Sequence, residues 1–254
     1  MLNNSCGKYF PKISIVTVVY NASHDLAVTI ASVSSQSYGN IEFIVIDGKS
    51  SDGTLDVASQ YSDSIDYFVS EPDQGIYDAM NKGLAAATGE YVHFLNAGDR
   101  FCDTNSLENI IRSVPGSVDV LYGDIILVST GGGSRHHKAM PFTLDNLKKF
   151  GTGVLCHQAM LVNREIACKY DASYKYKGEL GWYLDLFQEK PGLTWFHYEQ
   201  PLVYYYLGGV GYQDFVQNRL EWYRLLISRF GIRSVFNWSF MKFIFKDFRN
   251  RYGF

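Results

Sequence analysis

Residues 13–47 read ISIVTVVYNASHDLAVTIASVSSQSYGNIEFIVID and decide the fold. Two apolar runs rich in β-branched residues, Ile13–Tyr20 and Ile41–Asp47, flank a segment from about His24 to Gln36 with apolar residues at helical spacing. Unbroken apolar runs of this length are typical of strands buried on both faces of a parallel sheet. The order strand, helix, strand therefore predicts a βαβ unit with a right-handed crossover.

The alternation of strands and helices continues downstream. Ile65–Ser70 and Tyr91–Ala97 are predicted strands, and Gly75–Ala87 between them is a predicted helix. In the less regular second half we expect strands at Val118–Ser129 (one or two), His157–Asn163, Leu193–Glu199 and Leu202–Leu207, and a short helix at Leu180–Glu189. The pattern indicates an α/β fold, in which ligands lie beyond the carboxyl ends of the strands.

The composition is that of an ordinary folded domain. Of the 254 residues, 46% are hydrophobic and 19% are charged, which excludes a disordered chain. Four cysteines form no CxxC pair, so we expect reduced intracellular thiols. The start, MLNNSCGKYFPK, lacks the apolar core of a signal peptide, and no apolar stretch reaches the roughly 18 residues of a membrane span. These features predict a cytoplasmic protein.

The charge is unevenly distributed along the chain. Residues 219–254 hold eight Lys or Arg against two acidic residues, a local charge of +6, and residues 1–218 carry −9. Two helices are predicted in this region, at about Asp214–Phe230 and Ser234–Asn250. The basic end of the chain suits an anionic partner surface, whereas the acidic body argues against nucleic acid as a partner.

The last predicted helix is amphipathic. An apolar face edged with cations is typical of a helix that lies on an anionic membrane surface. Packing of the same face against the domain, or against a second subunit in a homo-oligomer, is the alternative, and both stay open. The apolar face holds Trp238, Met241, Phe245 and Phe248, and the cationic face holds Lys242, Lys246 and Arg249.

Polar residues follow the predicted strands. In IDGKSSDGT, Asp47 and Asp52 suit hydrogen bonds to a base or a ribose, or else simple turn formation and helix capping. The helix after EPDQG offers Asp78 and Lys82, which suit either a phosphate site or a surface ion pair. LNAGD ends the fourth strand with Asp99, which is either a ligand for Mg²⁺ or Mn²⁺ or a cap for the next helix.

Together these motifs resemble those of the inverting glycosyltransferases of family two. The matching elements are IVTVVYN, IEFIVIDGKSSDGT, EPDQGIYDAMNKG and LNAGD, in that order. The resemblance implies the GT-A fold, a Rossmann-like, mostly parallel twisted sheet with flanking helices and a C-terminal helical appendage. It implies a catalytic domain at 1–212, with a nucleotide-sugar half at about 1–100 and an acceptor half at about 101–212, and basic, aromatic helices at 213–254.

The sequence most resembles the bacterial enzymes of that family that build colanic acid, capsule or O-antigen repeat units on a lipid carrier. This likeness implies transfer of a hexose from a UDP-sugar to a lipid-pyrophosphate-linked sugar. It further implies a Mn²⁺ or Mg²⁺ cofactor. The place of action would be the inner face of the bacterial inner membrane, with the C-terminal helices on the membrane surface.

Residue by residue, the resemblance implies a nucleotide site and a metal ligand. Asp99 would hold the divalent cation, although Asn96 and Gly98 stand where the commoner DxDD pattern has carboxylates. Asp47 would contact the uracil. The other residues implied at the nucleotide are Thr17, Tyr20, Asn21, Ser50, Asp52, Asp78, Lys82, Asn96, Ala97 and Gly98.

The acceptor side resembles the family in CHQAMLVNREIACKYDASYKYKGELGWYLDLF, residues 156–187. Alignment of its tyrosines with the family pattern places Glu179 at the position of the catalytic base, with Asp185 as the alternative. His157 would lie near the donor sugar or the acceptor, or else be a core histidine. Gly208–Gly211 resembles a family turn that approaches the nucleotide.

Some patterns point elsewhere. His136 and His137 are metal ligands or residues of a solvated Gly-rich loop, and adjacent residues rarely chelate one ion well. No GxGxxG follows the first strand, which argues against a dinucleotide-dependent oxidoreductase. A non-catalytic member that binds a nucleotide-sugar as a partner subunit stays open, because Asn96 and Gly98 are not carboxylates.

Overall fold

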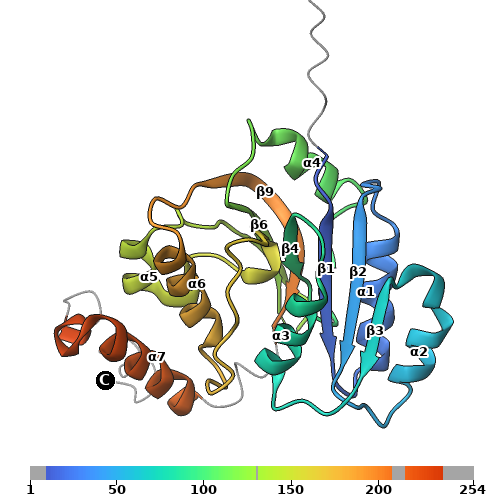
Figure 1. Cartoon of the computed structure of the whole chain (residues 1–254), viewed down its shortest axis with the longest axis horizontal. Helices are drawn as coiled ribbons and strands as arrows, with labels where there is room; N and C mark the ends of the chain where they lie inside the picture. Colours follow the sequence, from blue (N-terminus) through green and yellow to red (C-terminus); the bar gives the residue numbers. More distant parts are fainter. Residues whose placement is uncertain (1–9, 130, 208–214, 237–254) are drawn as a thin grey trace, which may run out of the picture.

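The computed structural model describes residues 10–129, 131–207 and 215–236. Within them, a nine-stranded sheet has the order β3-β2-β1-β4-β8-β6-β9-β5, and β7 pairs with β6 beside this row. Helices cover both faces of the sheet (Figure 1). This arrangement confirms the α/β class that the sequence predicts.

The first half follows the predicted alternation. Its elements are β1 (Ile13–Val19), α1 (Ser23–Ser34), β2 (Ile41–Asp47), α2 (Thr54–Gln60), β3 (Tyr67–Ser70), α3 (Ile76–Ala86) and β4 (Tyr91–Phe94). These four strands are parallel, and the register sets Val19 beside Asp47. All of β1 is buried, as its apolar run predicts. The carboxyl ends of the four strands therefore meet at one edge of the sheet.

The second half extends the sheet with strands of both directions. Its elements are β5 (Arg100–Phe101), α4 (Ser106–Ser113), β6 (Val120–Val128), β7 (Ser134–His137), α5 (Leu144–Phe150), β8 (Met160–Asn163), α6 (Gly178–Glu189), β9 (Trp195–Tyr206) and α7 (Phe215–Phe230). Strand β8 is antiparallel to both β4 and β6, whereas β9 is parallel to β6. The antiparallel β4–β8 pair joins the two halves.

Some elements differ from the prediction. Strand β9 is continuous where two strands were predicted, because the register with β6 slips at Gly123–Ile125, opposite Pro201, and the irregularity accommodates the proline. His157–Ala159 forms a 3₁₀ turn, so the strand predicted to begin at His157 begins after it, as β8. The Gly-rich loop is shorter than predicted, because Ser134–His137 pairs with β6 as β7. Helix α5 was not predicted.

The end of the chain is described in part. Helix α7 agrees with the helix predicted at Asp214–Phe230. The predicted turn at Gly208–Gly211 and residues 237–250 of the last predicted helix lie outside the described residues. Among the described helices, none combines the length and the apolar character that a membrane span requires. Contact of the last helix with a membrane stays a prediction.

The core consists of two apolar clusters, one on each face of the sheet. Because successive residues of a strand point to opposite faces, Val16 and Ile44 belong to the cluster under α3, α5, α6 and α7. Ile15 and Phe43, one residue earlier on each strand, belong to the cluster under α1 and α4. Each central strand thus packs against both helical layers, which fixes the position of its carboxyl end.

Glu42 binds the amino ends of the central strands together. Its carboxylate accepts hydrogen bonds from Lys12 Nζ at 2.7 Å, from Ser14 Oγ at 2.5 Å, and from Thr88 N at 2.8 Å and its Oγ1 at 2.5 Å. Burial opposes ionisation, but the bonds from Lys12, Ser14 and Thr88 outweigh it and lower the pKa of Glu42 to about 2. The ionised carboxylate therefore joins β1, β2 and the loop before β4.

We expect Glu42→Gln to lower the free energy of unfolding at pH 7 by about 2 kcal/mol, because an amide cannot accept from all of these donors. The folded-state pKa lies below the ordinary value of 4.5. The stabilisation is therefore present above pH 4.5 and disappears as the pH falls from 4.5 to about 2. Urea unfolding at pH 7, 4 and 2.5 measures it. Glu165→Gln, at an exposed position, is the matched control. If the difference in free energy of unfolding between the wild type and Glu42→Gln is as large at pH 2.5 as at pH 7, Glu42 is not the ionised carboxylate described above.

Candidate active site

Asp47 lies at the carboxyl end of β2 and is fully buried. Its carboxylate accepts hydrogen bonds from Ser50 N at 3.0 Å and from the hydroxyls of Ser50 and Ser70 at 2.5 Å. These bonds join the turn after β2 to the end of β3. The Asp47 carboxylate, which the resemblance assigns to the uracil, therefore fixes the turn after β2 against the end of β3.

The turn after β2 is also bound to the loop after β1. Asn21 has a φ of 47° and Lys49 a φ of 66°, both in the left-handed region that residues other than glycine seldom adopt. The backbone N–H of Asn21 donates to Ser50 Oγ at 2.7 Å. Asp52 accepts from Thr54 N at 3.0 Å, at the start of α2. The turn and capping alternative for Asp52 is therefore realised, and two loops of the site hold each other in place.

An exposed surface remains beside these loops. Tyr20 is 65% exposed, whereas Thr17 is fully buried and donates to the carbonyl of Leu95 at 2.7 Å. A Cβ at Gly48 would lie 2.4 Å from Asp73 Oδ2 and 3.3 Å from the Tyr20 ring, so a larger residue at this position requires the Asp73 side chain to move. Asp73 belongs to the EPDQG motif, but sequence reasoning did not single it out. Tyr20, Gly48 and Asp73 thus lie together at this edge, where Tyr20 is exposed and the other two are half-buried.

Lys82 is already paired with acidic groups. Its Nζ lies 2.9 Å from Glu71 Oε1 and 3.7 Å from Asp78 Oδ2, and it donates to the carbonyl of Pro72 at 2.8 Å. Asp78 also accepts from Gln74 N at 3.0 Å, at the start of α3. The surface-pair alternative for Asp78 and Lys82 is present, and the Lys82 cation braces the loop before α3.

Asp99 follows β4 in a tight turn and is 6% exposed. Gly98 has a φ of 98°, which favours glycine, and its N–H donates to Thr29 Oγ1 at 3.0 Å. The Oδ1 atom of Asp99 accepts from Tyr206 N at 3.0 Å, at the end of β9. Burial raises the pKa of Asp99 to about 7, although the Tyr206 N–H and nearby His157 act against the rise. Such a buried carboxylate gains from a nearby cation.

Glu179 and His157 form the centre of the site. Glu179 lies in the first turn of α6, and its Oε1 is 3.2 Å from Nδ1 of His157, which is 5% exposed. On the other side of the imidazole, Nε2 lies 3.5 Å from Nδ2 of Asn96. The structure thus brings Asn96, His157 and Glu179 into one row, with Asp99 close enough to His157 to affect its charge.

The charges of this row support one another. Burial would raise the pKa of Glu179, but His157 outweighs it and the pKa is lowered. Burial would lower the pKa of His157, but Glu179 and then Asp99 outweigh it and the pKa is raised. The Glu179 carboxylate and the His157 ring therefore each favour the charged form of the other. The Glu179 side chain is 28% exposed, so part of it reaches the surface of the site.

A second cation stands beside Glu179. Burial lowers the pKa of Lys177, and the nearby carboxylate of Glu179 acts in the opposite direction. Sequence reasoning did not predict a role for Lys177, and its only signal is its place two residues before the predicted base. Lys177 and His157 both lower the pKa of the Glu179 carboxyl group.

Asp185, the alternative base, is not part of this row. Its Oδ1 lies 2.5 Å from Nη2 of Arg229 on α7. His136 is also engaged elsewhere, because its Nε2 lies 2.7 Å from Asp124 Oδ2. Asp124 accepts in addition from His197, at 2.8 Å between its Oδ1 and Nε2. His136 is exposed, as the prediction of a solvated residue requires, but it lies in strand β7 and not in a loop, and β7 brings its ring to a buried carboxylate.

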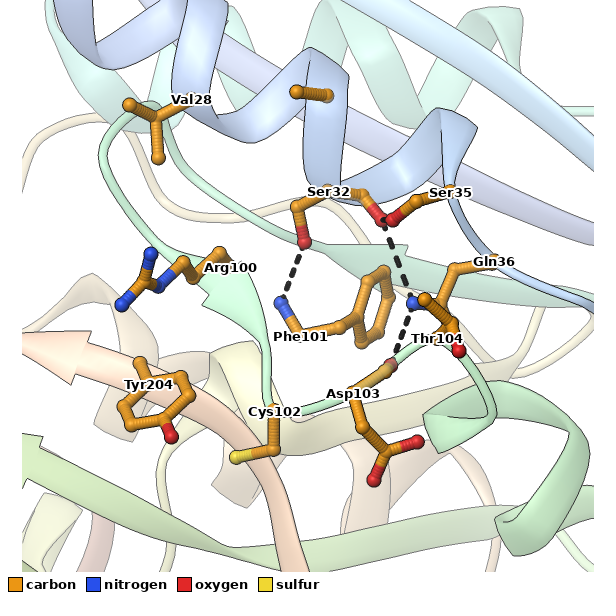
Figure 2. Close-up of a pocket in the computed structure, with 11 residues that line it drawn as sticks. Val28, Ser32, Ser35, Gln36, Arg100, Phe101, Cys102, Asp103, Thr104 and Tyr204 are labelled. Carbon is orange, nitrogen blue, oxygen red and sulfur yellow. Dashed lines mark hydrogen bonds between the residues drawn. The ribbon is translucent and has the colours of Figure 1, made fainter.

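A separate shallow pocket of about 540 Å³ lies between α1, β5 and β9. Arg100, directly after Asp99, lies with its guanidinium carbon 4.9 Å from the centre of the Tyr204 ring. Figure 2 shows Arg100 and Tyr204 on one side of this pocket and Ser35 and Gln36 on the other. None of the predicted site residues lines it, so the row at Glu179 remains the candidate active site.

The oxygen atoms near the row suit a divalent cation. Oδ1 of Asn96 is buried without a hydrogen-bond partner, and no described residue donates to Oδ2 of Asp99. Amide and carboxylate oxygens are ligands that Mg²⁺ and Mn²⁺ accept. Among the described residues, no three His, Cys, Asp or Glu side chains group into a metal site. The residues therefore fit a cation that draws its remaining ligands from a bound molecule.

Two curated proteins illustrate the likeness in sequence. An uncharacterized glycosyltransferase of Mycobacterium tuberculosis is 35% identical over 172 residues, which are 65% of this chain and 64% of that protein. A PGL/p-HBAD biosynthesis glycosyltransferase of Mycobacterium bovis is 33% identical over 162 residues, 61% of this chain and 60% of that protein. The match thus spans less than two thirds of the length of either relative.

Two solved structures illustrate the likeness in fold. TarS from S. aureus, in complex with UDP-GlcNAc, has a TM-score of 0.67 at 15% identity, over 85% of this chain and 64% of that chain. A mannosyltransferase from Pyrobaculum calidifontis, in complex with GDP-Man and Mn²⁺, has a TM-score of 0.61 at 17% identity, over 80% and 59% of the chains. These likenesses confirm the GT-A fold that the sequence motifs imply.

The family relationship rests on a match to a family sequence model. The sequence model described as Glycosyl transferase family 2 matches residues 14–170, more than half of the chain. The matched region contains the four parallel strands, the turn that ends at Asp99, and His157. Together with the relatives and the fold, this match establishes that the chain belongs to glycosyl transferase family 2.

Proposed function

We propose that this protein is an inverting glycosyltransferase that moves a hexose from a UDP-sugar to a hydroxyl of an acceptor. The observation that carries the proposal is the carboxylate of Glu179, in contact with His157, with the buried Asp99 near the same histidine. Nucleotide-sugars are bound in the solved structures named above, as UDP-GlcNAc and as GDP-Man. A base and a site for a leaving diphosphate are what a single displacement requires.

The donor would lie along the carboxyl edge of β1, β2 and β4. The base and ribose would meet Tyr20, Asp73 and the loops braced by Asp47. The diphosphate would approach Asn96 and Asp99, where a bound Mn²⁺ or Mg²⁺ would neutralise its charge. The GDP-Man and Mn²⁺ complex of the mannosyltransferase supports this cofactor.

Glu179 would act as the general base. The acceptor hydroxyl gives its proton to the Glu179 carboxylate while its oxygen forms a bond to C1 of the sugar. The bond between C1 and the diphosphate oxygen breaks at the same time, and UDP leaves with the electron pair. Attack from the face opposite to UDP inverts the anomeric centre. His157 holds the carboxylate ionised and in place.

The acceptor would be a lipid-pyrophosphate-linked sugar used in bacterial surface polysaccharide assembly. The basic, aromatic stretch at 219–254 supports action at the inner face of the inner membrane. The relative named for PGL/p-HBAD biosynthesis supports an acceptor from that biosynthesis as a second acceptor class. Assays with both kinds of acceptor distinguish them.

We expect Glu179→Gln to lower kcat by about 10²–10⁴-fold, because an amide cannot accept the proton of the acceptor hydroxyl. Affinity for UDP stays within about twofold, since Glu179 serves the acceptor side. Release of UDP in the presence of acceptor measures turnover, and calorimetry measures UDP binding.

Glu189→Gln is the matched control, because it makes the same change at an exposed position of the same helix. Its turnover should equal that of the wild type. If Glu179→Gln keeps wild-type turnover and Asp185→Asn abolishes it, the base is Asp185.

The metal requirement gives a separate prediction. We expect UDP to bind tightly with Mn²⁺ and at least about tenfold more weakly with EDTA or in Asp99→Asn, because the diphosphate then lacks its counter-charge. Asp103→Asn, four residues further on and exposed, is the matched control. Absence of UDP binding under every condition would remove the UDP-sugar assignment. Binding without turnover of any donor would favour the non-catalytic partner subunit.

A further inference from the structure

A carboxylate of α7 binds the loop that leads into α6. Oε1 of Glu221 accepts a hydrogen bond from Lys175 N at 3.0 Å, and Oε2 accepts from Tyr176 N at 2.7 Å and Lys177 N at 3.0 Å. Three consecutive backbone amides thus converge on one side chain. The next residues along the chain are Gly178 and Glu179.

The same loop is held from its other side by α3. A Cβ at Gly178 would lie 2.6 Å from the ring of Tyr77, so the backbone rests directly on that ring. Tyr77 is itself buried in the core. The loop therefore lies between Tyr77 and Glu221, and its position sets where the first turn of α6 presents Glu179.

Helix α7 does not depend on Glu221 for its own attachment. Trp222, Leu225 and Leu226 are buried in the core cluster under α5, α6 and α7. A Cβ at Gly151 would lie 3.3 Å from the Trp222 ring. The far end of α7 is held by the ion pair of Arg229 with Asp185. The helix is therefore a rigid support from which Glu221 reaches the loop.

The three bonds restrict the backbone of this loop. Lys175 is exposed, and Tyr176 and Lys177 are half-buried. A carboxylate that accepts from three consecutive amides ties them to one point on α7 and limits their conformational freedom. The restricted backbone is the one that leads into the proposed base.

We propose that Glu221 is a positioning residue that keeps Glu179 in the position where its carboxylate contacts His157. This inference rests on the proposed role of Glu179 as the general base. Misplacement of a reacting group by about 1 Å costs on the order of 100-fold in rate. Loss of the clamp therefore lowers turnover without weakening the donor site, which lies on the other side of the row.

The test compares Glu221→Ala, Glu221→Gln and the control Arg229→Ala. In Glu221→Ala, we expect amide hydrogen exchange at 175–177 to rise about tenfold or more, while 222–230 stays protected. With a UDP-sugar and an acceptor sugar, kcat falls about 10–100-fold and the donor KM stays within about twofold. Glu221→Gln, which keeps one acceptor oxygen, recovers part of the loss.

Arg229→Ala removes a contact at the far end of α7 and leaves the bonds of Glu221 to the loop in place. It loosens exchange at the far end of α7, leaves 175–177 protected and keeps kcat within about threefold. An equal loss of kcat in Arg229→Ala and Glu221→Ala would overturn the proposal, because general docking of α7 would then explain it. Unchanged exchange at 175–177 in Glu221→Ala would also overturn it. If the wild type transfers no sugar, the proposed function fails, and the exchange data still decide whether the clamp exists.

Discussion

The contact between His157 and Glu179 is the interaction on which the candidate site depends. Each charge carries a desolvation cost on burial, and their attraction offsets that cost only at short range. The two side chains meet at 3.2 Å although one precedes β8 and the other begins α6. The pair therefore joins the start of α6 to the turn before β8, while the buried apolar residues of α6 hold the helix on the sheet. Asn96 continues the row to the end of β4, which the antiparallel β4–β8 pairing brings alongside.

The carboxyl edge of β1, β2 and β4, where the donor is proposed to lie, is held in a different way. Neutral and charged hydrogen bonds within its own loops fix it. The side chains of Asp47 and Asn21 accept hydrogen bonds from neighbouring turns, and Lys82 forms an ion pair with Glu71. These bonds leave the loops preorganised but with few free groups. In the proposed donor complex, a nucleotide would therefore meet mainly the exposed ring of Tyr20, the loop of Asp73 and the turn that ends in Asp99.

Sequence reasoning was most successful where burial is continuous. The apolar runs of β1 and β2 gave their bounds almost to the residue, because both faces of these strands are covered. Family motifs selected Asn96, Asp99 and Glu179, and the structure gathers them around His157. Contacts between distant helices have no local pattern. Neither the Asp185–Arg229 pair nor the three amides held by Glu221 is visible before the helices are placed.

The family match ends at residue 170, before Glu179 and before the helix that carries Glu221. The segment proposed to hold the nucleotide and the segment proposed to present the base are thus consecutive along the chain, yet they share one core. Trp182 of α6 packs edge-on against Phe94 of β4, and β9 pairs along the length of β6. Because a protein interior is close-packed, a change of residue on one segment has to preserve its contacts with the other. The two proposed roles of this chain therefore cannot vary independently of the core that joins them.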